Sequence, residues 1–243
     1  MKPSPAAAFA LLMLPASALA QHAAPSSQAH VIHHESIQSY VQFNRLETWD
    51  ADPGAGLAWE GHAWVGTDSN RLWLRSEGER IDGKLESADL EVLYGRPISR
   101  WWDLVAGVRH DFAPGNSRDY AAIGVIGLAP YKLEVAATAY IGQAGQTAAR
   151  VEVGYETLLS NRLVLQPLVE VEAHGRDDPA RGLGAGLSTV EAGLRLRYEV
   201  TRRFAPYIGM VHERSFGRTA LFRELDGHPA RDTRVVVGAR IWF

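Results

Sequence analysis

The sequence predicts an all-β protein, an antiparallel transmembrane β-barrel of about twelve strands with a polar lumen lined by arginine and glutamate. Apolar and polar residues alternate along most of the chain after residue 36, and charged residues dominate the polar positions. Turn signals divide this region into strands of about ten to thirteen residues, whereas soluble strands have about five or six. Strands of this length can cross a bilayer at a tilt.

The N-terminal residues form a region separate from the predicted barrel. Residues 1–20 have the features of a secretory signal peptide, with Lys2 at the start, an apolar core and a small-residue cleavage site near Ala20. An uncleaved amphipathic or core helix is the alternative. Residues 21–36 are polar and proline-punctuated, which predicts a flexible periplasmic tail that contains histidines. The barrel is expected over residues 37–243. The histidines of the tail are His22, His30, His33 and His34.

The alternation assigns one face of each strand to lipid and the other to the lumen. In the last strand, Val235, Val237 and Ile241 share a parity that opposes Arg234 and Arg240. The expected strands cover residues 37–47, 56–66, 70–79, 84–96, 101–112, 118–128, 131–142, 147–158, 161–174, 187–200, 204–215 and 232–243.

The connections between these strands alternate in length. Tight turns are expected near residues 66–70, 97–100, 129–130, 160 and 201–203, and longer loops at 48–55, 175–186 and 216–231. Short turns at one rim and longer loops at the other are typical of outer-membrane barrels. Many aromatic residues lie near strand ends, as expected of girdles at the two membrane interfaces. These residues include Trp49, Trp73, Trp101, Tyr131, Tyr140, Tyr155, Tyr198 and Tyr207.

The composition excludes several kinds of site and partner. The absence of cysteine excludes disulfides and thiolate metal sites, and the net charge of −3 argues against a nucleic-acid partner. Of the 25 basic residues only Lys2, Lys84 and Lys132 are lysines. Arginine suits pairing with carboxylates in a confined lumen. A soluble β-sandwich, which would also alternate, is the competing fold.

Histidines and carboxylates are the candidate metal ligands. His33, His34 and Glu35 precede the first strand, and Glu60 and His62 share a parity in the second. Imidazole and carboxylate are ligands for Cu(II) and Zn(II). Alternatively, the carboxylates only neutralise arginines. The full candidate set is His30, His33, His34, Glu47, Glu60, His62, Glu77, Glu79, Met210 and His212, and the sequence leaves open whether Met210 and His212 face lipid or lumen.

Several segments resemble the copper resistance protein B family. Residues 70–79 (NRLWLRSEGE) resemble its motif N-x-L-W-L-K/R-x-E-G-E, and residues 102–109, 127–131, 161–167, 177–188 and 204–209 also match in order. The resemblance implies a Gram-negative outer-membrane barrel that binds copper ions or mediates their passage, working beside a periplasmic multicopper oxidase. Outer-membrane lipid and the outer-membrane assembly machinery, for which the ending on Phe243 is typical, are the other expected partners.

The chain departs from the family in its sulfur ligands. Members often carry a tail rich in Met and His, whereas after residue 20 this chain has only Met210. Thioethers favour Cu(I), whereas imidazole suits Cu(II), so a tail that offers histidines without methionine favours Cu(II). A general channel or structural barrel without metal specificity is the alternative function. An outer-membrane hydrolase is a third, but the sequence shows no catalytic motif and no obvious serine–histidine pair, so we expect no enzyme.

Overall fold

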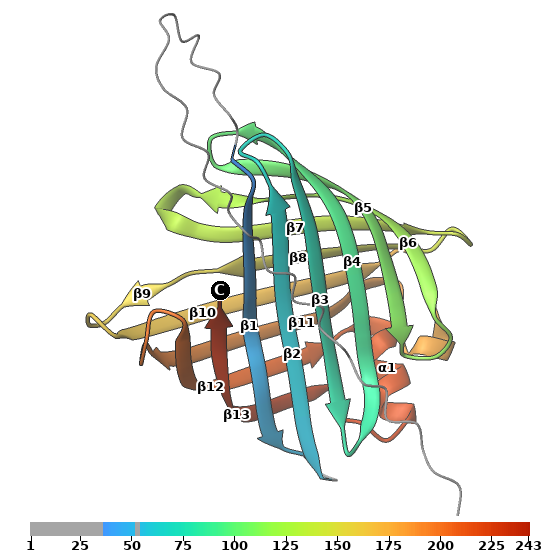
Figure 1. The fold of residues 1–243 in the computed structure, drawn as a ribbon. Helices are drawn as coiled ribbons and strands as arrows, with labels where there is room; N and C mark the ends of the chain where they lie inside the picture. Colours follow the sequence, from blue (N-terminus) through green and yellow to red (C-terminus); the bar gives the residue numbers. More distant parts are fainter. Residues whose placement is uncertain (1–35, 52–53) are drawn as a thin grey trace, which may run out of the picture. The chain divides into compact units, whose positions relative to one another are not determined.

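The computed structural model describes residues 36–51 and 54–243, which form a closed antiparallel β-barrel (Figure 1). Each strand pairs with its neighbours in chain order, and β13 pairs with β1 to close the wall. The strands are β1 (Gln38–Asp50), β2 (Ala55–Gly66), β3 (Arg71–Ile81), β4 (Lys84–Ser99), β5 (Trp102–Ala113), β6 (Arg118–Ala129), β7 (Leu133–Gly142), β8 (Thr147–Gly154), β9 (Thr157–Leu158), β10 (Leu163–His174), β11 (Gly186–Tyr198), β12 (Phe204–Ser215) and β13 (Arg231–Trp242).

The predicted fold class is confirmed, with one interruption. Strands β8 and β9 both pair with β10 and occupy one of the twelve positions in the wall, where a single strand over 147–158 was predicted. The ladder breaks at Tyr155 and Glu156. The nitrogen of Tyr155 donates to the carbonyl of Pro167, but Pro167 has no N–H to return the bond. The prediction of a continuous strand was therefore wrong at these two residues.

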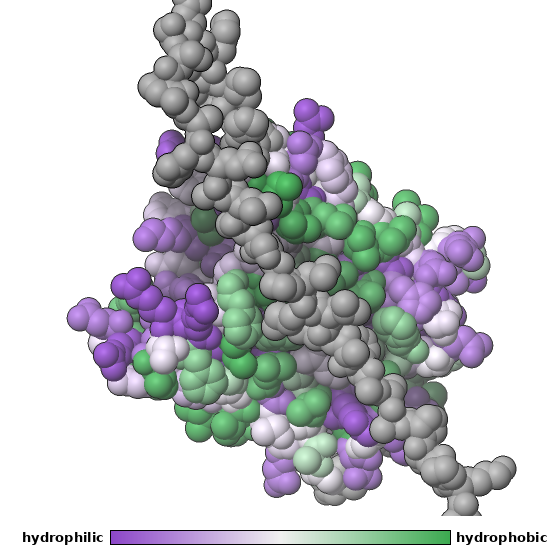
Figure 2. All heavy atoms as spheres, viewed as in Figure 1, coloured by the Kyte–Doolittle hydropathy of each residue, from purple (hydrophilic) through white to green (hydrophobic). Residues whose placement is uncertain are grey.

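The outer wall is apolar at every second position, as predicted. Val108, Ile123 and Val235 are all more than half exposed although they lie in the middle of strands. Figure 2 shows apolar side chains over the wall in this view and hydrophilic ones toward its ends. This band is the surface that lipid would cover.

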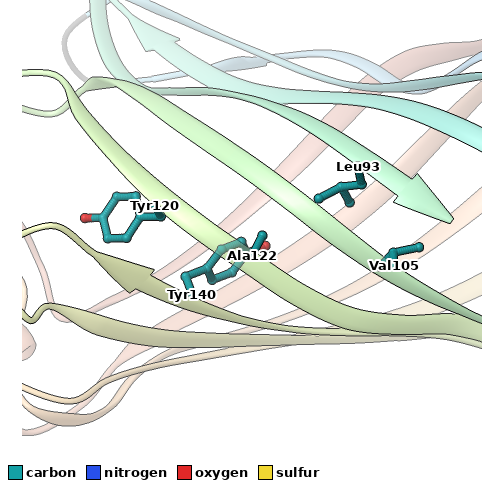
Figure 3. Packing of buried hydrophobic residues seen from close by; sticks show 5 residues of the cluster. All are labelled: Leu93, Val105, Tyr120, Ala122 and Tyr140. Atoms are coloured by element: carbon teal, nitrogen blue, oxygen red, sulfur yellow. The ribbon is translucent and has the colours of Figure 1, made fainter.

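The inner wall carries two apolar clusters in addition to its charges. One consists of Leu93, Val105, Tyr120, Ala122 and Tyr140 on β4–β7 (Figure 3). The other contains Trp49, Val211 and Val236.

The predicted aromatic girdles are confirmed only in part. Trp49, Tyr140 and Tyr207 point inward and are buried, whereas Trp101 and Tyr131 are exposed at the short turns. Proximity to a strand end did not distinguish the two orientations, because parity decides which face a side chain joins.

The connections follow the predicted division into short turns and longer loops, with two corrections. The segment 216–231 contains a helix, α1 (Gly217–Leu225), where a loop was predicted. The hairpin between β1 and β2 is tighter than predicted, because Asp50 pairs with Ala55. Two short 3-10 turns, η1 (Pro130–Lys132) and η2 (Pro179–Arg181), complete the described structure. In the described ranges, no helix is long and apolar enough to cross a membrane.

The lipid-facing assignment can be tested with a pair of substitutions. Val108→Arg places a charge at the middle of β5 and should lower the free energy of unfolding in phospholipid vesicles by about 2–4 kcal/mol. Leu85→Arg, near the end of β4, should cost no more than about 1 kcal/mol because the charge can reach the interface. Urea unfolding of the vesicle-embedded barrel measures both, and equal costs would contradict a bilayer spanning the middle of the wall.

Candidate functional site in the barrel lumen

Arg45 lies at the centre of the lumen and contacts four carboxylates. A bulge in β1 between Phe43 and Arg45 inserts Asn44 into the ladder with β2, so that Asn44 and Arg45 both reach Glu60. The Arg45 Nε lies 2.6 Å from Glu60 Oε2. Its other nitrogens lie 2.8 Å from Glu77, 3.0 Å from Glu191 and 3.8 Å from Glu170. One guanidinium therefore joins β1, β2, β3, β10 and β11 across the barrel.

Arg150 of β8 extends this network to the opposite wall. It lies 2.7 Å from Glu77 and 2.6 Å from Glu172, and Glu170 is 3.3 Å away. Asp89, at 3.7 Å from Arg150, also contacts Arg109 at 3.0 Å. The arginines and carboxylates thus form a continuous lattice of alternating charge, which confirms the predicted lining.

Glu47 belongs to a second cluster, nearer the β12–β13 wall. Its carboxylate accepts bonds from Arg195 at 2.5 and 3.2 Å and from the Tyr207 hydroxyl at 2.9 Å. Gly193 leaves room for the guanidinium, since a Cβ there would lie 2.4 Å from Arg195 Nη1. All three polar side chains are buried, so this cluster fastens β1 to β11 and β12.

A small polar cavity lies beside these networks, between β2, β3, β4 and β8. Its volume is about 30 Å³, enough for one to three water molecules at roughly 10–15 Å³ each. Five carboxylates and one imidazole face two arginines, so the cavity carries an excess of acidic groups. The lining residues are Glu60, Gly61, His62, Arg75, Ser76, Glu77, Asp89, Glu91, Arg150 and Glu152.

His62 lines the cavity and has aromatic side chains as neighbours. Its ring centroid lies 6.0 Å from those of Tyr40 and Trp73, and its Nδ1 is 3.5 Å from the Asn44 amide. Asn44 also donates to Glu60 at 2.7 Å, so one amide positions both the imidazole and the carboxylate. The two predicted candidates of β2 are therefore neighbours in space.

The structure separates the predicted site residues into groups. Glu60, His62 and Glu77 share the cavity, whereas Glu47 is held in the Arg195 cluster. Met210 and His212 face outward; Met210 is 54% exposed, and the His212 Nδ1 contacts Thr233 at 2.7 Å. The sequence left open which face of β12 carries Met210 and His212. The structure places both on the outer face, so they do not meet the lumen carboxylates. His30, His33 and His34 lie outside the described residues.

Three lumen carboxylates make no ion pair within 4 Å to any residue of the described ranges. They are Glu79, Glu134 and Glu152, on β3, β7 and β8. Glu152 lines the cavity, as do Asp89 and Glu91, and none of these three was among the predicted ligands. Their inward parity could have identified them. Over residues 36–51 and 54–243, no three His, Asp or Glu side chains stand together as a preformed metal site.

The long-loop end of the lumen is covered by the segment between β10 and β11. Arg181 of this segment is buried and donates to Asp111 at 3.0 Å and to the Ala113 carbonyl at 3.3 Å. It thus fastens the segment to the β5–β6 hairpin, although β7 and β8 lie between them in the wall. Helix α1 joins the same cover, because the Thr219 hydroxyl accepts from Gly184 N at 2.8 Å.

One serine–histidine pair that was not obvious from the sequence joins two neighbouring strands. The His174 Nδ1 lies 3.1 Å from the Ser188 hydroxyl, across the ladder of β10 and β11. Ser188 is fully buried, and its hydroxyl is also 2.8 Å from that of Thr219. In this structure the pair connects the barrel wall to α1.

Comparisons with known proteins agree with the sequence resemblance. Residues 37–243 match the family model described as "Copper resistance protein B precursor". The chain is 50% identical over 218 residues to the "Copper resistance protein B homolog" of Pseudomonas syringae pv. tomato, covering 90% of this chain and 74% of that protein. It is 43% identical over 216 residues to "Copper resistance protein B" of Escherichia coli, covering 89% and 73%.

Among solved structures, the NanC porin in its rhombohedral crystal form is similar in fold. The TM-score is 0.50 and the identity 13%, and the match covers 84% of this chain and 99% of that one.

The central role of Arg45 can be tested by its removal. Arg45→Ala leaves four carboxylates without their shared counter-charge and should lower the free energy of unfolding by about 3–5 kcal/mol. Arg80→Ala is the matched control, since the guanidinium of Arg80 reaches only the Gly83 carbonyl in the described structure, and it should change stability by about 0.5 kcal/mol or less. Urea unfolding of the refolded barrels measures both, and a similar small loss for Arg45→Ala would show that the lattice does not brace the barrel.

Proposed function

Because the chain belongs to the copper resistance protein B family, we propose that it is an outer-membrane barrel that binds copper ions in its lumen and lets them cross the outer membrane of a Gram-negative cell. Copper is the cargo in this proposal, and the barrel acts without catalysis. The observation that carries the proposal is the acidic cavity at His62.

The donors of this cavity suit Cu(II). Carboxylate oxygens and a single imidazole are available, and the one methionine of the described chain faces outward. Glu152 has no ion-pair partner within the described ranges, whereas Glu91 Oε2 lies 3.4 Å from Arg75 Nη1 and accepts no hydrogen bond. A divalent cation that entered here would therefore find, at Glu152, a carboxylate that makes no ion pair with an arginine of the described chain, and, at Glu91, an oxygen with room for a further partner.

Binding requires an exchange of partners around the cavity. Glu60 and Glu77 are held by Arg45 and Arg150, so a cation must compete with a guanidinium for each carboxylate. Such competition weakens the site and favours release, which suits passage better than storage. Arginine remains charged throughout, so the network can reform once the ion has left.

The lattice of charges supports this proposal over a general channel. Arg45 and Arg150 reach across the lumen at mid-height, and the Arg181 segment covers one end. Only an ion that can enter the charge network, such as a cation replacing arginine at a carboxylate, is expected to pass. Glu79 on β3, two residues from Glu77, offers a carboxylate where no such replacement is needed, because it makes no ion pair in the described part of the chain.

The remaining elements of the proposal lie outside the described structure. The tail histidines His30, His33 and His34 would collect the metal on the periplasmic side, after cleavage of the signal peptide near Ala20. A periplasmic multicopper oxidase is the proposed functional partner, and the outer-membrane assembly machinery the proposed insertion route.

Copper titration of the refolded barrel tests the site. Cu(II) should bind with nitrogen coupling from one lumen imidazole in its electron paramagnetic resonance spectrum, and His62→Ala should weaken binding at least roughly tenfold, since losing one ligand group costs on the order of 1.4 kcal/mol or more. His110→Ala is the matched control, because His110 faces outward and contacts Asp119 at 2.6 Å. Both variants are made in a chain whose tail histidines are replaced by alanine, so that only the barrel is titrated.

Two outcomes would contradict the proposal. The first is Cu(II) affinity that is unchanged by His62→Ala while copper tolerance of the cell is also unchanged. The second is an unselective ionic conductance in planar bilayers that copper does not affect, which would favour the general channel.

A further inference from the structure

The rim that carries the short turns is strongly basic. Its turns and strand ends present six exposed basic side chains, whereas the acidic side chains there that make no ion pair with a described residue are Asp68, Glu134 and Glu199. The six are Arg96, Arg100, Lys132, Arg162, Arg202 and Arg203. We call these six residues the basic rim.

The basic rim lacks internal counter-charges. None of its side chains makes an ion pair with a residue of the described ranges, in contrast to the arginines of the lumen. Arg100 instead lies over the ring of Trp101, 5.4 Å from its centroid. These charges are free to meet anions from outside the protein.

The opposite rim has a different balance. Its six exposed basic side chains, Arg80, Lys84, Arg176, Arg214, Arg218 and Arg231, are accompanied by a similar number of exposed acidic ones. The acidic residues of that rim include Asp82, Glu86, Asp119, Glu224 and Asp226. The excess positive charge is therefore a property of the short-turn rim.

Aromatic side chains place the basic rim at the level of lipid headgroups. Trp101 is 56% exposed and Tyr131 87% exposed, and Tyr198 and Phe204 flank the turn that holds Arg202. Tryptophan and tyrosine favour the boundary between acyl chains and headgroups. Figure 2 shows strongly hydrophilic side chains at the left, where Figure 1 places β9 and the turns beside it.

We propose that the basic rim binds the phosphate groups of anionic phospholipids in the leaflet that the short turns contact. Arginine donates to phosphate oxygens in a two-pronged geometry, and long basic side chains can extend from the wall to the headgroup level. Short turns face the periplasm in outer-membrane barrels, so this leaflet is the inner one. The rim then recruits a shell of anionic lipid, independently of any cargo in the lumen.

Lipid selectivity of the refolded full chain tests the proposal. Spin-labelled phosphatidylglycerol should associate with the barrel at least roughly threefold more strongly than spin-labelled phosphatidylcholine, since each basic residue near a membrane surface contributes on the order of 1 kcal/mol toward anionic lipid. The variant Arg100→Gln/Arg162→Gln/Arg202→Gln/Arg203→Gln should bring this ratio close to one. The matched control Arg80→Gln/Lys84→Gln/Arg214→Gln/Arg231→Gln, on the other rim, should keep it.

Further measurements distinguish headgroup phosphate from free phosphate, and lipid from a protein partner. Millimolar inorganic phosphate should leave this lipid ratio unchanged. If the phosphate brings the ratio close to one, the rim is a site for free anions instead of a headgroup site. A wild-type ratio near one overturns the proposal and favours an acidic protein partner for the rim. An equal fall of the ratio in both variants also overturns it. Heat-dependent electrophoretic mobility confirms that each variant is folded.

Discussion

A charge enclosed by a closed sheet needs an opposite charge beside it, and the position of Arg45 follows from this requirement. Four carboxylates from four other strands converge on its guanidinium, and removing any of them changes the balance for the rest. The bulge at Asn44, the space at Gly193 and the second network at Arg150 all serve to bring such groups within reach. The wall supplies the geometry, and the lattice of charge holds opposite sides of the wall together.

The same lattice explains why an interior this polar need not be a wide pore. Long arginine and glutamate side chains fill the middle of the barrel and leave a cavity of about 30 Å³. Such a space admits a cation that has lost most of its water, provided that protein oxygens replace it. The proposed passage of copper thus depends on exchange between metal and guanidinium at shared carboxylates, which a water-filled channel would not require.

Most of the fold was predictable because the decisive signal is local. Side-chain alternation in β13 or β10 is visible without knowing any partner, and it placed the strands within a few residues. The break at Tyr155 and the helix after Phe216 were missed, since the first depends on Pro167 of another strand and the second carries no capping side chain.

Less of the candidate site could be predicted from the sequence, because the alternation assigns a residue to one face of the wall but does not identify its partner. Arg45 and Glu191 are 146 residues apart, and only closure of the barrel brings them together. Parity assigned Glu60, His62 and Glu77 to the lumen face, and all three line the cavity. It could not show that Glu47 is occupied by Arg195 or that Glu152 is not occupied by any arginine of the described chain.

The contact of Glu47 with Arg195 and Tyr207 has a consequence for the order of assembly. These partners lie 148 and 160 residues apart, on the first strand and on strands near the end of the chain. Their contact therefore cannot form while the sheet is a growing ribbon with β1 and β13 still apart. Until that seam closes, Glu47 and Arg195 lack each other as partners, whereas pairs between neighbouring strands, such as Arg45 with Glu60, can already form. The closing of the seam and the burial of this cluster are then a single event.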